Sequence, residues 1–419
     1  MNIRFKTKNY KKGVAILMVL IVVMLMTSII FDLIYSSRVS SRISSNFASD
    51  VKAYYLSKAA FNFAKIFLKY DMQAQEQISS QMESMLSGSG LGGIQLGNID
   101  PSSMHLWDVM PMSYPPQVEL LTSLLGFSSS EEDEKDNEEK EPSTQDEDAD
   151  DDGRYEIEVI DESHKININA LKDEKIPAAG EHRLTIDLLI NLFNQESFKE
   201  LFKDEASNKR EVLAYQILDW IDENYESENP RVGGDENAPY YRLSKPYKPK
   251  NGPFHSIEEL NLIADMEDKY YKAFSPYLTV YGEDSSGKID AKINVKVAPK
   301  EVIATFFNDS ITNKMELAEK VVDLRTSESK ENLEASKFLD TVRLKLKENG
   351  SLGEEITSCA DLFLSALCRD KKNYITNVSS KFQVIAKGLF KESEKKIISV
   401  IDRGKSFSDE IRILYWRIE

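Results

Sequence analysis

The sequence predicts an α+β protein: an N-terminal transmembrane helix packed on a small antiparallel β-sheet, with a large all-α domain inserted after the first strand. Three observations predict this fold. Residues 14–34 are almost entirely apolar, residues 154–160 and roughly the last forty residues alternate between apolar and polar side chains, and the region between them has helical patterning. With 419 residues and 41% apolar content, the chain can form two folded units beyond the membrane anchor.

Residues 1–13 form a basic leader with five Lys or Arg side chains and no acidic one. The positive-inside rule keeps such a segment in the cytoplasm and sends the rest of the chain across the membrane. Residues 14–34 would span roughly 30 Å as a helix, which is enough to cross one bilayer. The small residue Gly13 stands before the apolar run, and no cleavage site of the ordinary signal-peptide kind follows that run.

This junction resembles the leader of type IV pilins and type II secretion pseudopilins, which is cut after a Gly that precedes the hydrophobic helix. The resemblance implies cleavage between Gly13 and Val14 by a prepilin peptidase, with methylation of the new N-terminus. Met18 would then be the fifth mature residue, where most of these proteins have a Glu that pairs with the amine of a neighbouring subunit. A subunit without this carboxylate fits a filament tip, where no such neighbour is present. The alternative is a signal anchor that is never cut.

Residues 35–78 are predicted to continue the membrane helix as a periplasmic spine, because apolar side chains recur at near-helical spacing without a proline. The alternative, a coiled-coil stalk, needs a stricter heptad repeat. Residues 79–152 are predicted to be a disordered insertion, first Ser/Gly-rich and then acidic. Residues 131–152 carry 14 Asp/Glu against two Lys, which is −12 of the total net charge of −17. We interpret this run as a solvated tether rather than a calcium buffer.

Residues 153–164 are predicted to hold the first strand, and residues 165–375 an inserted helical domain. The segments KININA (165–170) and KINVKV (292–297) each precede a helical stretch, which indicates two related units at about 165–290 and 291–375. Their Asn residues are suited to capping turns or helices. Residues 376–419 contain three more candidate strands at 382–386, 396–401 and 411–418, and these would complete the sheet on the N-terminal helix.

The two cysteines, Cys359 and Cys368, are expected in the periplasm, where disulfides persist. On one continuous helix their spacing would place the thiols on opposite faces, about 13 Å apart and too far to bond. A disulfide therefore requires the helix to break between them. The sequence does not decide between a disulfide and a pair of buried free thiols. The four histidines are scattered, and no Cys/His set has zinc-ligand spacing.

Oxygen ligands gather in one segment, which runs from Asp219 through Gly233-Gly234 to Tyr241. Between Asp222 and Glu236 it holds six carboxylates and one cation, Arg231. Ca²⁺ takes six to eight oxygens from carboxylates, amides and backbone carbonyls of a bending loop. The candidate ligands are Asp222, Asn224, Glu226, Asp235 and Glu236. The loop lacks the twelve-residue pattern of an EF-hand, and the alternative is a solvated acidic loop without metal.

Several segments, taken in order, resemble protein K of type II secretion systems. They are DWIDENYE, GGDENAPYY, NGPFHSIEELNLI, FSPYLTVYG and the terminal VIDR and ILYWR. The resemblance implies a pilin-like fold with calcium bound in the helical domain. Asn224 stands where the family usually has Asp, and Asp235-Glu236 reverses the usual Glu-Asp order, so the ligand assignment departs from the family pattern. The acidic insertion before residue 154 is also unusual for the family.

These observations predict a minor pseudopilin: a non-enzymatic subunit anchored once in the inner membrane, with its C-terminal domain in the periplasm. The resemblance implies that it joins the I-type and J-type minor pseudopilins at a pseudopilus tip and primes assembly of the major pseudopilin. A minor type IV pilin is the alternative of the same class. A membrane-anchored helix-hairpin-helix DNA-binding module is a third reading. It is disfavoured because the helical units lack Gly-rich basic hairpins and the chain is acidic, so we expect no nucleic-acid partner.

Overall fold

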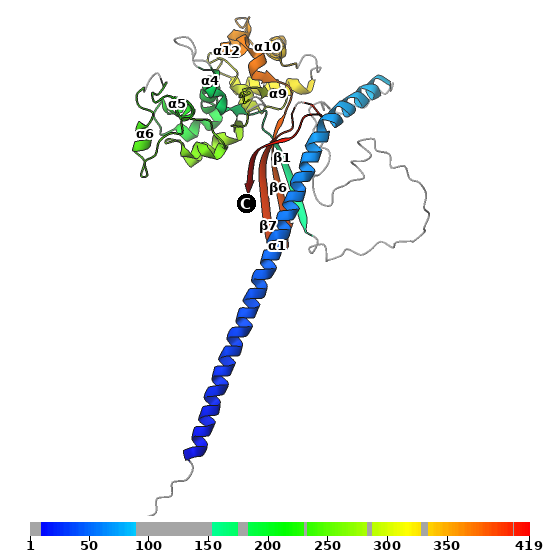
Figure 1. The fold of residues 1–419 in the computed structure, drawn as a ribbon. Coiled ribbons are helices and arrows are strands. Elements are labelled where there is room, and N and C mark those ends of the chain that lie inside the picture. The colour runs from blue at the N-terminus through cyan, green and yellow to red at the C-terminus, as the bar shows by residue number, and fades with distance from the viewer. Residues whose placement is uncertain are drawn as a thin grey trace, which may run out of the picture.

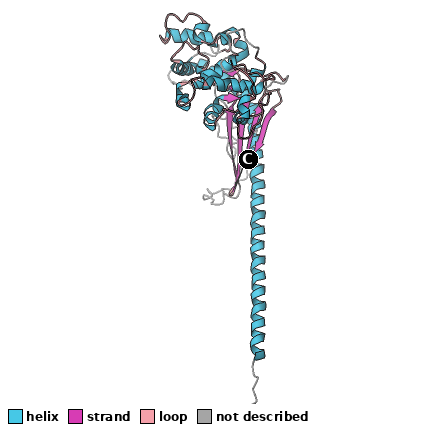
Figure 2. Ribbon diagram, turned by 90° about the vertical axis from the view of Figure 1, so that its left-hand side faces the viewer, coloured by secondary structure: helices cyan, strands magenta, loops and turns pink. Residues whose placement is uncertain are grey.

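The computed structural model describes residues 10–88, 153–174, 183–229, 233–282, 287–327, 334–404 and 406–419. The predicted α+β class is confirmed: the chain has an apolar N-terminal helix followed by mixed helix and sheet. One long helix runs beside a narrow sheet, and a helical insert lies at the end of the sheet away from the N-terminal half of that helix (Figures 1 and 2). The acidic run at 131–152 lies outside the described residues.

Helix α1 spans Tyr10–Gly88 and contains the predicted membrane segment. Within Ala15–Asp71 the most apolar stretch has a mean hydropathy of 2.7, so the helix is long and apolar enough to cross a membrane. Its large apolar side chains are exposed from Ile16 to Ile34, as expected for a surface that faces lipid. The helix continues ten residues beyond 78, where the sequence suggested that the spine would end.

The sheet has four antiparallel strands in the order β1-β6-β7-β8. They are β1 (Arg154–Asp161), β6 (Lys381–Phe390), β7 (Ser393–Asp402) and β8 (Arg412–Ile418). Each overlaps a segment whose alternating pattern predicts a strand. Because β1 pairs with β6, all the chain between residues 162 and 380 is inserted between two neighbouring strands.

Helix α1 covers one face of this sheet through small residues. Ala53, Ser57, Ala60 and Ala64 are fully buried there, and larger side chains such as Phe61 fill the space beside them. The closest approach is at Gly388 in β6, where a Cβ atom would lie 2.1 Å from the backbone oxygen of Ala53. The small helix side chains, together with the missing side chain at Gly388, let the helix lie directly on the strands.

The insert consists of two units that repeat one supersecondary pattern. Each unit begins with a two-residue strand and ends with another that pairs with it in parallel, β2 with β3 and β4 with β5. In β2 the side chain of Asn167 accepts a hydrogen bond from the amide of Asn169, and in β4 Asn294 does the same for Lys296. These are the two Asn residues of the repeated sequence segments, and both hold a turn.

The first unit contains β2 (Ile166–Asn167), η1 (Ile168–Lys172), α4 (Leu184–Phe193), η2 (Glu196–Phe202), α5 (Lys209–Ile221), α6 (Ala238–Tyr241), η3 (Ile257–Leu262), α7 (Asp268–Phe274), η4 (Ser275–Tyr277) and β3 (Leu278–Thr279). The second unit contains β4 (Ile293–Asn294), α8 (Lys300–Ala304), α9 (Lys314–Ser327), α10 (Phe338–Glu348), α11 (Cys359–Leu362), α12 (Ser365–Arg369), α13 (Lys371–Tyr374) and β5 (Ile375–Thr376). One continuous apolar core runs through both units, so they are packed as a single body.

A disulfide joins Cys359 and Cys368 in the second unit. The helical stretch is interrupted between α11 and α12, where Phe363 has an extended backbone. This break brings the two Cα atoms to 6.0 Å, within the range for a disulfide and far closer than one continuous helix would allow.

The two connections between sheet and insert lie side by side. The amide of Glu162 donates to the carbonyl of Lys381 at 2.9 Å, and the hydroxyl of Ser163 accepts from the amides of Ser380 and Lys381. The amide of Asn294 donates to the carbonyl of Ser163 at 2.7 Å, which ties the second unit to the same point. The insert is therefore held where it leaves the sheet and where it returns.

Candidate metal centre

The best-formed candidate site begins at the C-terminal end of α5. Asp219 lies in its last turn, and Asp222 follows the helix with an extended backbone while its amide still bonds to Leu218. Residues three apart on a helix lie on one face, so the two carboxyl groups are neighbours. A helix C-terminus carries partial negative charge, which makes two carboxylates there unfavourable unless a cation is present.

A loop then returns the chain to the same place. Gly233 and Gly234 both have positive φ, 55° and 93°, which suits glycine and reverses the chain direction. The two arms of the loop are joined by a hydrogen bond from the amide of Ser227 to the carbonyl of Gly234 at 2.8 Å. A second bond, from the amide of Glu236 to the carbonyl of Tyr225, fixes Glu236 at the end of the return.

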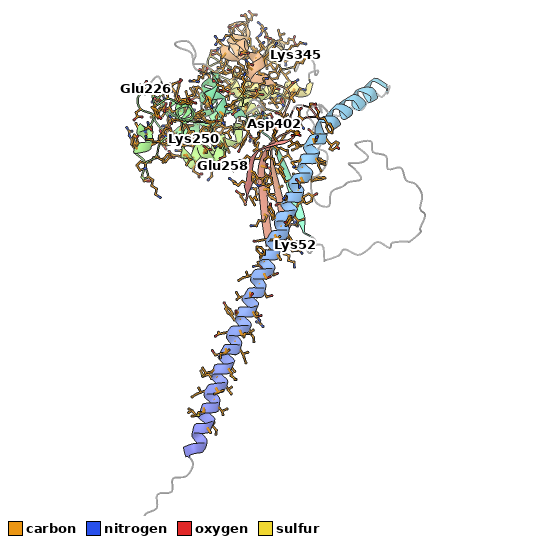
Figure 3. The ribbon with its side chains drawn as sticks, viewed as in Figure 1. Lys52, Glu226, Lys250, Glu258, Lys345 and Asp402 are labelled. Atoms are coloured by element: carbon orange, nitrogen blue, oxygen red, sulfur yellow. A yellow bond between two sulfur atoms is a disulfide. The ribbon has the colours of Figure 1, made fainter. Side chains whose placement is uncertain are left out.

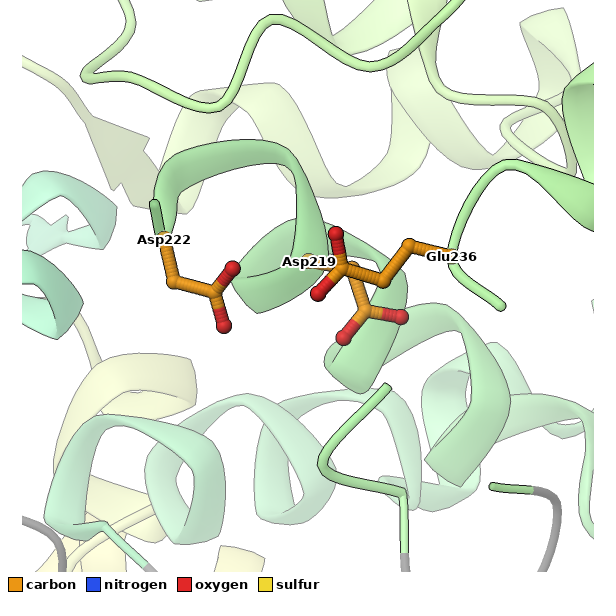
Figure 4. A group of neighbouring side chains, drawn as sticks. All are labelled: Asp219, Asp222 and Glu236. Atoms are coloured by element: carbon orange, nitrogen blue, oxygen red, sulfur yellow. The ribbon is translucent and has the colours of Figure 1, made fainter. Parts of the chain in front are cut away.

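The result is a cluster of three carboxylates from two segments of the first unit. Figure 4 shows the side chains of Asp219, Asp222 and Glu236 pointing toward one another. One oxygen from each lies within 4.8 Å of the others, and Asp219 and Glu236 are buried. Four of their oxygens are shielded from solvent and have no hydrogen-bond partner among the described residues: Asp219 Oδ1, Asp222 Oδ1 and both Glu236 Oε atoms.

The electrostatics of this cluster favour a cation. Burial raises the pKa of Asp219 to about 7, although hydrogen bonds from Ser227 and Glu228 oppose the shift. Burial also raises the pKa of Glu236, as do the negative charges of Asp222 and Asp219. The pKa of Asp222 is raised too, again mainly by burial. Three carboxyl groups so placed either hold protons or share a positive ion.

The structure separates the five candidate ligands predicted from the sequence into two groups. It brings Asp222 and Glu236 together, whereas Asn224, Glu226 and Asp235 are exposed on the loop outside the cluster. Figure 3 shows Glu226 in the insert, well away from Lys52 on α1.

Two of the exposed candidates, Asn224 and Asp235, hold the loop in its conformation through hydrogen bonds. The Asn224 side chain donates to Asp222 Oδ2 at 2.8 Å and accepts from the amide of Glu226. Asp235 Oδ1 accepts two hydrogen bonds from Asn237, which lower the pKa of Asp235.

Asp219 is the member that the sequence reasoning missed. It lies inside a buried helix rather than in the acidic loop, so composition does not single it out. Its spacing of three from Asp222 at a helix end is the signal that could have found it.

The donor set fits a hard divalent cation such as Ca²⁺. Carboxylate oxygens are the ligands that this ion prefers, and backbone carbonyls or waters complete its shell of six to eight. The unpartnered buried oxygens are those that a metal would satisfy. The side-chain oxygen of Asn237 is also buried and has no partner among the described residues, which adds an amide oxygen close to Glu236.

The remaining predicted site residues lie elsewhere. Gly13 and Val14 are within the first turns of α1, and cleavage between them stays a prediction. Cys359 and Cys368 form their disulfide in the second unit, away from the carboxylate cluster of the first.

The chain is similar to known proteins in part of its sequence and in its fold. Residues 164–283 match the family described as "Type II secretion system (T2SS), protein K", a region that contains the whole carboxylate cluster. A chain in the crystal structure of the GspK-GspI-GspJ complex from enterotoxigenic Escherichia coli type 2 secretion system has a similar fold. The TM-score is 0.51 at 15% sequence identity, over 91% of this chain and 99% of that one. No curated protein matches the sequence.

Proposed function

We propose that this chain is a minor pseudopilin of the protein K family of type II secretion systems, and that it forms the tip of a periplasmic pseudopilus and helps to prime its assembly. The role is structural rather than enzymatic. The chain would be anchored once in the inner membrane by α1, with the sheet and the insert in the periplasm.

The observation that carries the tip assignment is the position of the insert. A helical body wider than the α1–sheet unit lies at the end of the molecule away from the membrane segment (Figure 1). A subunit stacked above it would collide with this body, whereas subunits below would meet only α1 and the sheet. The molecule is therefore suited to cap a filament and poorly suited to a place inside one.

The proposed partners are other minor pseudopilins of the I and J types, the major pseudopilin and a prepilin peptidase. The similar E. coli chain was crystallised in a complex of three such proteins, which supports the first of these. Exposed apolar side chains of α1, with Tyr35, Ile43 and Phe47 below the sheet and Tyr55 beside it, support contacts with neighbouring pseudopilin helices. The peptidase would act between Gly13 and Val14.

A crosslinking experiment in cells tests the tip position. A photoreactive amino acid replaces Phe47 on α1, which is 70% exposed, or Leu344, which is 50% exposed on α10. Helix α10 lies at the end of the insert away from the membrane segment (Figure 1). We expect the Phe47 position to crosslink to other pseudopilins and the Leu344 position not to do so. Efficient crosslinks from Leu344 to a pseudopilin would show that subunits stack above the insert and would contradict the proposal.

We further propose that Asp219, Asp222 and Glu236 hold Ca²⁺ in this subunit. When bound, the ion would supply positive charge that allows all three carboxylates to be ionised together. Asp219 and Asp222 would be fixed to the return of the loop at Glu236, so the ion would join α5 to the start of α6. Calcium would thus stabilise the first unit without taking part in any reaction.

Thermal unfolding of the full chain in detergent tests the calcium site. The substitution Glu236→Gln removes one cluster carboxylate, and Asp235→Asn alters its exposed neighbour as a control. We expect Ca²⁺ to stabilise the wild type and Asp235→Asn by about 2.7 kcal/mol at a hundredfold excess over Kd. The Glu236→Gln protein should lose this gain and, in chelator, should melt above the wild type because mutual repulsion is reduced. An equal calcium effect in all three proteins would exclude this cluster as the site.

A further inference from the structure

A small polar cleft lies where the sheet meets both helical units, away from the carboxylate cluster. It is bordered by the end of β1, the end of β3, the start of β4 and the start of β6. Its charged lining residues are Glu162, Lys165, Asp290, Lys292 and Lys381. Three cations therefore face two carboxylates, which leaves the cleft with one excess positive charge.

The carboxylates of this cleft are already engaged. Glu162 and Lys165 form a buried ion pair with an N–O distance of 2.5 Å, so they neutralise each other. The carboxylate of Asp290 accepts a hydrogen bond from the backbone amide of Lys292 at 3.1 Å. With that ion pair set aside, the ammonium groups of Lys292 and Lys381 face the single carboxylate of Asp290, which leaves one excess positive charge.

Lys381 is the lining residue that most favours a bound anion. It is only 8% exposed, and among the described residues its ammonium group has neither an ion pair nor a hydrogen-bond acceptor. Lys292 is half-buried, and within the described chain its ammonium group is unpaired as well. The Nζ atom of Lys381 is not among the shielded polar atoms that lack a partner in the described residues, so its ammonium group opens into the cleft, where an anion can pair with it as Glu162 pairs with Lys165.

Two hydroxyl groups offer further donors on the same lining. Thr279 Oγ1 accepts from the amide of Tyr281, and Thr376 Oγ1 accepts from the amide of Val378. Because each oxygen acts as an acceptor, each hydroxyl hydrogen is left to donate to another group. The cleft thus combines two unpaired ammonium groups with two O–H donors, which is the complement of an oxyanion.

We propose that this cleft binds a small oxyanion, a carboxylate or sulfate, between Lys292 and Lys381. Lys292 precedes β4 of the second unit, Thr279 ends the first unit and Lys381 begins β6. A bound anion would therefore fasten both helical units to the sheet at the point where the insert is attached. The site is independent of the calcium proposal, since none of its residues belongs to the carboxylate cluster.

Thermal unfolding of the detergent-solubilised full chain, with chelator present, tests this site. Sodium sulfate and sodium acetate are each titrated against sodium chloride at equal ionic strength. The variants are Lys381→Gln and Lys292→Gln, and the control is Lys245→Gln, an exposed lysine outside the cleft. Because sulfate stabilises folded proteins generally, the measured quantity is the saturable part of the rise in Tm and its difference between variants.

We expect a saturable rise in Tm for the wild type and Lys245→Gln, and its loss in both cleft variants. A response to acetate would identify a carboxylate ligand, and a response to sulfate alone a tetrahedral anion. If Lys381→Gln fails to fold, the half-buried Lys292→Gln carries the test. A rise that is linear in salt, or equal in the control and the cleft variants, would overturn the proposal.

Discussion

At the scale of single residues, His164 is a half-buried base that the fold keeps neutral. Burial lowers its pKa from 6.5 to about 4, with the positive charges of Lys165 and Arg325 acting in the same direction. Between these two values the unfolded chain binds a proton that the folded chain does not. Stability is therefore present above pH 6.5 and is lost as the pH falls toward 4, by up to roughly 3 kcal/mol.

The substitution His164→Gln should flatten this pH dependence, because Gln carries no charge at either pH. Urea unfolding of the full chain at pH 7 and pH 5 gives the difference in free energy of unfolding. The exposed His255 provides the control, and His255→Gln should keep the slope of the wild type. A slope in His164→Gln that equals the wild-type slope would show that other groups account for the acid sensitivity.

Residue types alone indicated the acidic loop as a candidate calcium site, and they named Asp222 and Glu236 without separating them from the exposed candidates. Asp222 and Glu236 are acidic residues in an acidic stretch, and so are Glu226 and Asp235, which the structure leaves exposed. What separates the two sets is burial, and burial is decided by packing against distant segments. Asp219 shows the same limit, because its carboxyl group is withdrawn by the core around α5.

At the scale of elements, contact between α1 and the sheet depends on small residues. A Cβ atom at Gly388 would lie 2.1 Å from Ala53 O and 2.4 Å from Ser57 N, both on the helix backbone. We expect Gly388→Ala to force the helix away from β6 and to destabilise the protein by about 1–3 kcal/mol, the usual cost of overpacking. Denaturant unfolding measures the change.

Gly252 supplies the matched control for this substitution. A Cβ atom there would meet only Lys250, at 4.0 Å. Gly252→Ala should therefore leave the stability nearly unchanged. An equal and small effect at both glycines would show that the α1–sheet contact is less close than described.

The sequence predicts long elements better than short ones. Strands β6 and β7 each span ten residues, and their alternation is visible in the residue pattern. The paired strands β2–β3 and β4–β5 have two residues each, too few for any periodicity. Their existence depends on pairing between segments more than eighty residues apart, which only the folded chain establishes.

At the scale of the whole molecule, one buried ion pair joins α1 to the sheet and to the attachment of the insert. Arg403, after β7, binds Asp71 of α1 at 2.5 Å, and both side chains are almost fully buried. The same guanidinium donates to the carbonyl of Ser379, just before β6, and lies over the ring of Phe382. Three parts of the fold therefore meet at one side chain.

Removing one partner of this pair should be costly, because it leaves the other charge buried. We expect Arg403→Leu to lower the free energy of unfolding by about 3–5 kcal/mol, and the double change with Asp71→Leu to recover part of the loss. The exposed pair Lys272–Asp268 is the control, where Lys272→Gln should cost less than about 1 kcal/mol. If Arg403→Leu cost no more than Lys272→Gln, the buried ion pair would not be what joins these three parts of the fold.

The two segments that attach the insert to the sheet lie side by side. Glu162 and Lys381 are bonded backbone to backbone, and β1 and β6 are adjacent antiparallel strands, so the insert occupies the place of a hairpin turn. A short turn joining residues 161 and 382 would leave the register of β1 and β6 unchanged. The insert is thus a module that could be excised, which would leave α1 on a four-stranded sheet with its strand order intact.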